Sequence, residues 1–122
     1  MRRRAAVRLL LLLAIGFGAT SVFAKGPPRC QGSDSYEYGL CRYHGGNFED
    51  AERVFRRFLE HTEPSPQAIR ARYFLARAEM KQRKWSEASA EWIRIFELDA
   101  GFYREWSCDF LLGECRRELG QG

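Results

Sequence analysis

Residues 46–59, Gly-Asn-Phe-Glu-Asp-Ala-Glu-Arg-Val-Phe-Arg-Arg-Phe-Leu, decide the fold of this chain. Their apolar side chains recur every three or four residues, which is the spacing of one face of an α-helix. Residues 84–96, Lys-Trp-Ser-Glu-Ala-Ser-Ala-Glu-Trp-Ile-Arg-Ile-Phe, repeat this pattern, so that Ala88 matches Ala51 at a distance of 37 residues. The chain therefore contains a repeated helical unit.

Turn and capping residues divide the rest of the chain into helices. Gly45-Gly46 separates a first helix from the second, and Asn47 is expected to cap the second. Pro64 ends that helix, and Ser65-Pro66 begins the next as an N-cap followed by a first-turn proline. The sequence predicts an all-α domain with helices over 34–44, 48–62, 66–82, 85–98 and 107–119.

A helix pair repeated every 37 residues resembles the tetratricopeptide repeat, whose period is near 34 residues. The resemblance covers most of residues 34–119. It implies an αα-hairpin solenoid of two repeats plus a C-terminal capping helix, with 120–122 as a short tail. Small residues at the family's expected places should let the helices approach closely: Gly39, Ala51, Ala76, Ala88 and Gly113.

Two stretches, 46–61 and 111–120, look like the tetratricopeptide domains of Gram-negative envelope proteins. Examples are the cell-division coordinator of the Tol-Pal system and the outer-membrane assembly lipoproteins. The chain departs from both, because it has no room for the coiled-coil trimerisation segment of the former and no lipidated cysteine as in the latter. The resemblance implies a partner in the cell envelope.

The N-terminus has the features of a secretory signal peptide. Arg2, Arg3 and Arg4 precede an apolar run over 9–19, and small residues lie one and three places before Lys25. This order predicts Sec-type export with cleavage after Ala24, and hence a periplasmic or secreted protein. The alternative is an uncleaved anchor, although the run is shorter than the ~20 residues that span a bilayer. Residues 25–33 then form a flexible stub rich in glycine and proline.

The basic charge of the chain belongs to this N-terminal segment. The sequence has 20 Lys and Arg against 16 Asp and Glu, a formal net charge of +4. The four arginines within 1–24 account for the whole excess, which leaves the mature domain formally neutral. A nucleic-acid partner therefore has no support from charge.

Four cysteines remain after cleavage, and in an oxidising compartment they are disulfide candidates with three possible connectivities. Cys30 can fold back from the stub onto Cys41, and this pair is favoured. Cys108 and Cys115 can pair only if the last helix starts after Cys108, since seven residues of helix separate them by about 10 Å. The other possibility is that some are buried thiols.

Residues suited to catalysis are few, and we expect no enzyme, no cofactor and no metal. His61 lies at a helix C-terminus, where a cation is favoured by the helix dipole. His44 with Cys41 makes only half of a zinc site. No phosphate loop, nucleophile elbow or zinc-protease helix is present.

A binding function fits the sequence better, because repeat hairpins line a concave face with the first helix of each pair. Tyrosine and arginine, which dominate many peptide interfaces, are frequent there. The alternative is that some of these tyrosines fill the core. The asparagines that clamp a chaperone C-terminus in some relatives are replaced by Leu40 and Arg77, so that partner is not expected. The predicted peptide-binding residues are Tyr36, Leu40, Tyr43, Arg70, Tyr73, Arg77, Met80 and Lys81, with His44, Phe110, Glu114 and Arg117 on the same face.

The competing hypothesis is a structural subunit or assembly factor of an export, pilus or outer-membrane complex. Two hairpins and one helix fall below the three repeats usually needed for independent stability. The exposed end is then sealed by disulfides, self-association as a homo-oligomer, or permanent incorporation. Phe102, Tyr103 and Trp106 are candidates for that contact.

Overall fold

The computed structural model describes residues 30–32 and 35–121, and within them the chain forms six helices and no strands. The all-α class is therefore confirmed. The predicted signal peptide and most of the stub lie outside the described residues. The helices are α2 (Tyr36–His44), α3 (Phe48–Glu60), α4 (Pro66–Lys81), α5 (Trp85–Leu98), α6 (Ala100–Glu105) and α7 (Cys108–Glu118).

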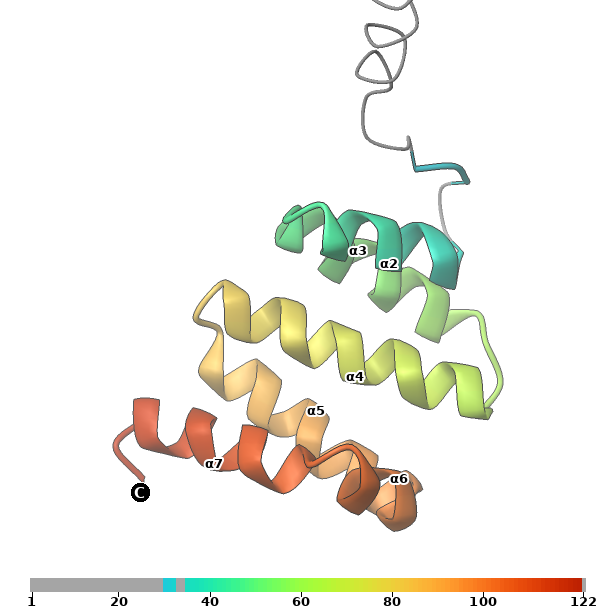
Figure 1. Ribbon diagram of the computed structural model, residues 1–122. Helices are drawn as coiled ribbons and strands as arrows, with labels where there is room; N and C mark the ends of the chain where they lie inside the picture. Colours follow the sequence, from blue (N-terminus) through green and yellow to red (C-terminus); the bar gives the residue numbers. More distant parts are fainter. Residues whose placement is uncertain (1–29, 33–34, 122) are drawn as a thin grey trace, which may run out of the picture.

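Helix α4 runs across the middle of the molecule, with α2 and α3 on one side and α5, α6 and α7 on the other (Figure 1). One apolar cluster joins α2, α3 and α4 around Phe55 and Leu75, and a second joins α4, α5 and α7 around Trp92 and Ile95. Since α4 contributes to both clusters, it is packed on two sides. No helix within the described residues is both long and apolar enough to cross a bilayer.

The predicted helix boundaries agree with the structure to within two residues, but one cap differs. Ser65 caps α4 as expected, because its Oγ accepts a hydrogen bond from the Ala68 N–H at 3.0 Å. Asn47 does precede α3, yet its side chain makes no capping hydrogen bond. The start of α3 is tied to α2 instead, through an ion pair of 2.6 Å between Asp50 and Arg42.

Helix α6 was not predicted. Its N-cap is Asp99, whose Oδ1 accepts from the Phe102 N–H at 2.9 Å. The rings of Phe102 and Trp106 stack with centroids 4.7 Å apart, and Trp106 meets Tyr73 of α4 edge-on at 5.0 Å. Tyr103 meets Phe96 of α5 edge-on at 5.2 Å, so all three side chains expected to contact a partner at the end of the domain pack within the chain.

The cysteines form one disulfide and leave two thiols. Cys30 is bonded to Cys41, the pair favoured by the sequence, with Cα atoms 5.6 Å apart. Cys108 and Cys115 lie two turns apart on α7 and are buried as free thiols, so they are not disulfide partners of each other. Burial, assisted by Asp109, raises the pKa of Cys108 to about 11, which keeps this thiol protonated and unreactive.

We expect loss of the disulfide to destabilise α2 in particular. The bond closes a short loop of 11 residues, for which the restriction of the unfolded chain contributes about 3 kcal/mol. The double variant Cys30→Ser, Cys41→Ser should lose this amount in denaturant titration and show faster hydrogen exchange in α2 than in α4. Reducing agent should have no further effect on that variant. Equal stability of the two proteins would show that the bond contributes nothing.

Candidate functional site

The eight predicted peptide-binding residues, called the binding stripe below, differ in how far the structure exposes them. Arg70 and Lys81 are exposed, whereas Leu40, Tyr43, Arg77 and Met80 are partly buried. Tyr36 and Tyr73 are buried, each with 9% of its surface exposed. These two tyrosines belong to the core, so little of their surface is available to contact a ligand.

Aromatic rings contact one another in a continuous band that runs from α2 across α4 to the residue after α6. Tyr43 of α2 meets both Phe48 and Phe74 edge-on, with centroids 5.4 Å apart in each pair. Phe74 in turn meets Tyr73 at 5.2 Å, and Tyr73 meets Trp106. The band therefore holds α2, α4 and the segment after α6 together, and it makes a rigid base for the polar groups beside it.

Arg77 is the charged group that this band positions. Its Nη1 donates to the Tyr73 hydroxyl at 3.1 Å, and its guanidinium carbon lies 5.9 Å from the centre of that ring. Burial, the largest single effect, lowers the pKa of Arg77, but the hydroxyls of Tyr43 and Tyr73 together raise it above its usual value. The guanidinium is thus held in one place and remains cationic.

A groove with a volume of about 240 Å³ lies beside Arg77, between α4 and α7. Its lining combines two cations, one carboxylate and apolar walls. Such a lining suits a peptide segment that presents a carboxylate and an apolar side chain. The lining residues are Arg77, Met80, Lys81, Trp85, Leu111 and Glu114.

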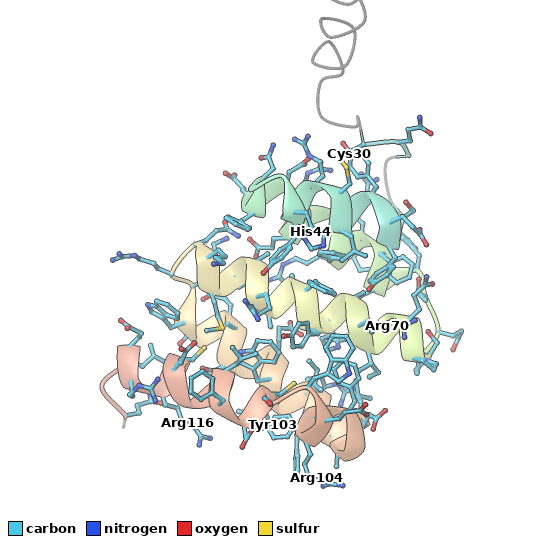
Figure 2. All side chains as sticks on the ribbon, viewed as in Figure 1. Cys30, His44, Arg70, Tyr103, Arg104 and Arg116 are labelled. Atoms are coloured by element: carbon cyan, nitrogen blue, oxygen red, sulfur yellow. A yellow bond between two sulfur atoms is a disulfide. The ribbon has the colours of Figure 1, made fainter. Side chains whose placement is uncertain are left out.

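The structure thus brings together only part of the predicted stripe. Arg77, Met80 and Lys81 line the groove, together with Glu114 of the last helix. Arg70 lies near the other end of α4 (Figure 2), about 16 Å from Lys81 along the helix. There it acts on the Tyr36 hydroxyl: burial raises the pKa of Tyr36, and the positive charge of Arg70 offsets part of that rise.

Two groove residues were missed from the sequence. Trp85 is the first residue of α5, and Leu111 is the fourth residue of α7. The repeat could have indicated Trp85, because it lies 37 residues after Phe48. In the structure, the ring of Phe48 likewise lies close to a cation of α4, 6.0 Å from the Lys81 ammonium. Leu111 gave no comparable signal, since its place depends on how α7 packs against α4.

A metal site at His44 is not possible in the form considered from the sequence. Cys41 is bonded to Cys30 and has no thiolate to offer. His44 is exposed and meets the ring of Tyr43 edge-on at 5.5 Å. Within the part of the chain that the structure describes, no three His, Cys, Asp or Glu side chains are grouped for a metal ion.

A cluster of charged and polar side chains lies between α3 and α4. Glu52 and Glu79 are buried. Glu52 accepts from Lys84 at 2.8 Å and from Gln82 at 3.0 Å. Although burial raises the pKa of Glu52, these hydrogen bonds, with that of Arg56, lower it overall.

Glu79 is the extreme member of this cluster, with none of its surface exposed. Its Oε2 accepts from Arg56 at 3.3 Å, while Oε1 has no hydrogen-bond partner among the described residues. Burial, together with nearby Glu91, raises its pKa to about 8 despite Arg56. A carboxyl group without exposed surface is in no position to meet a substrate, so Glu79 itself has a structural role.

The candidate site is therefore the groove between α4 and α7, with Arg77 as its fixed cation. Comparison with known proteins adds nothing to this assignment. No protein-family model, curated protein or solved structure matches the chain.

Proposed function

We propose that this protein is an exported, non-catalytic adaptor of the tetratricopeptide type that binds a peptide segment of another cell-envelope protein. The observation that carries the proposal is the groove between α4 and α7, in which Arg77 is fixed by the Tyr73 hydroxyl beside apolar walls. A guanidinium held in this way binds a carboxylate with little loss of side-chain entropy.

Equivalent environments 37 residues apart support the repeat. Ala51 and Ala88 are both without exposed surface, as are Phe55 and Trp92, the large residues that follow them. The turns agree as well, because Gly46 and its equivalent Arg83 both have positive φ, at 82° and 62°. Each helix pair therefore closes in the same way.

Export to the periplasm rests on the N-terminal sequence and is supported by the disulfide, since such bonds persist in oxidising compartments.

A second function, that of a structural subunit, is favoured by one observation. Phe96 and Phe110 are exposed at the α5–α7 end of the domain, at 52% and 61%. An exposed apolar surface of this kind is typical of protein contacts.

Site-specific crosslinking tests the adaptor function. A photo-crosslinking amino acid at Met80, inside the groove, should capture a defined segment of an envelope protein in living cells. The same crosslinker at Glu60, an exposed residue at the end of α3, should not. A synthetic peptide of the captured segment should then bind the purified protein, and should bind the double variant Arg77→Gln, Lys81→Gln about 10- to 100-fold more weakly.

The matched control is Arg94→Gln, which removes an exposed arginine from α5. It should bind the peptide as the unchanged protein does. Equal capture from Met80 and Glu60, or equal peptide affinity of the groove variant at unchanged thermal stability, would contradict the assignment.

A further inference from the structure

Exposed apolar side chains gather at one end of the molecule. All of the large hydrophobic residues exposed in the described part of the chain belong to α5, to α7 or to the residue that ends α7. The other helices have none of them. These residues are Ile93, Phe96, Leu98, Phe110 and Leu119.

The 37-residue repeat explains why Phe110 is among them. Its equivalents Tyr36 and Tyr73 are buried, because Tyr36 packs against Phe55 of α3 and Tyr73 against Trp92 of α5. Phe110 has the same place on α7, but no described helix follows to cover it.

The glycines at the equivalent places show the same difference. A Cβ atom on Gly39 would lie 2.5 Å from the ring of Phe55, so α2 and α3 are in close contact there. A Cβ atom on Gly113 would meet only Arg117 of its own helix, at 3.8 Å. The glycine thus leaves a flat, uncovered place in the middle of α7.

An apolar groove adjoins this place. It has a volume of about 260 Å³ and lies between α5 and α7, with Tyr103 and Arg116 at the edge of the molecule nearest α7 (Figure 2). Its lining has one cation and no acid. The lining residues are Ile93, Phe96, Tyr103, Leu112 and Arg116.

Beside this groove, α7 has one acidic and one basic side chain that could pair with the same two side chains of a second copy. Asp109 and Arg116 are exposed on α7, and neither has an ion-pair partner in the described part of the chain. They are seven residues apart, so both lie on one side of the helix, about 10 Å apart. The midpoint between them falls at Leu112 and Gly113. A second α7 crossing antiparallel at that midpoint would place each Asp109 beside the other copy's Arg116.

We propose that a second copy of this chain docks here, with the two α7 helices antiparallel about a two-fold axis at Gly113. Two reciprocal pairs between Asp109 and Arg116 set the register, and Phe96 and Phe110 of each copy become covered. Two-fold symmetry requires such a self-complementary surface. The proposal names the contact for the structural-subunit function and is independent of the peptide groove between α4 and α7.

Sedimentation analysis tests the dimer with the full chain, expressed with its own N-terminal segment and purified as the cell processes it. The unchanged protein should sediment as a dimer. Asp109→Arg and Arg116→Asp, each alone, should weaken the dimer about tenfold or more, because each brings like charges together. Glu60→Arg, a charge reversal at an exposed residue at the end of α3, should leave the dimer unchanged.

Mixing the two single variants is the decisive step. One variant carries only arginines at the two positions and the other only aspartates, so a mixture should form a heterodimer that neither forms alone. Circular dichroism should show that each variant is folded. A monomeric unchanged protein, a dimer indifferent to both substitutions, or variants that fail to associate when mixed would each overturn the proposal.

Discussion

Gly39→Ala should destabilise the protein by about 3 kcal/mol, which is large for the addition of one methyl group. The new Cβ would lie 2.5 to 2.8 Å from three atoms of the Phe55 ring. That ring has no exposed surface and packs against Tyr36 and Phe74, so it has nowhere to move. The helices α2 and α3 must separate, which opens the apolar cluster that joins them to α4. Denaturant titration measures the loss as a lower midpoint.

Gly113→Ala is the matched control. It makes the same change at the equivalent place on α7, where the nearest atom would be 3.8 Å away. The gain in helix propensity should then stabilise the protein by about 0.5 to 1 kcal/mol. Both substitutions are best compared in an Arg116→Asp background, so that dimerisation does not contribute. If Gly39→Ala stabilised the protein as Gly113→Ala does, the close packing of α2 on α3 would be wrong.

The contrast between these glycines shows why part of the fold could be predicted and part could not. Helix positions depend on local signals, such as the period of apolar residues and the cap at Ser65, and the sequence contains these in full. Close approach at Gly39 and at Gly113 was predicted from the same repeat pattern. The prediction is wrong at Gly113, because no described helix follows α7. A repeat pattern describes the face that a residue occupies, but it does not say whether a neighbour covers that face.

The candidate site shows the same limit. Arg77, Met80 and Lys81 were predicted correctly as neighbours on one face of a helix, which follows from their spacing alone. Tyr73 lies four residues before Arg77 on α4, and Tyr36 is its equivalent on α2. Both tyrosines are nevertheless buried, since aromatic residues of α3, α5 and α6 pack over them. Helix α6 itself has six residues, too few to show a period.

Glu79 is the clearest case of a residue whose environment the sequence concealed. Its equivalents in the repeat are Arg42 and Arg116, which are charged and retain exposed surface. Arg42 and Arg116 belong to the first and last of the described helices, whereas Glu79 belongs to α4, which is packed on both sides. The same position is therefore buried only in the central helix.

Burial of Glu79 should make the protein less stable as the pH rises from about 5 to 8. Its pKa is about 8 in the folded protein and 4.5 as an ordinary glutamate, so between these values the folded state holds a proton that the unfolded state has lost. Folding therefore takes up a proton, and raising the pH opposes it. The stabilisation is complete below pH 4.5 and is lost by about pH 8, with a total change of about 3 to 5 kcal/mol.

Glu79→Gln isolates this effect, because an amide has nearly the same shape and no proton to lose. Denaturant titrations at intervals from pH 5 to 8 should show a falling stability for the unchanged protein and a much flatter profile for the variant. Above pH 8 the variant should be the more stable of the two, because it no longer has a carboxylate among Glu52, Glu87 and Glu91. Glu97→Gln, on the exposed face of α5, should keep the slope of the unchanged protein. Parallel profiles for the unchanged protein and Glu79→Gln would mean that the Arg56 guanidinium fully compensates the buried charge, and that the carboxyl group is ionised throughout this range.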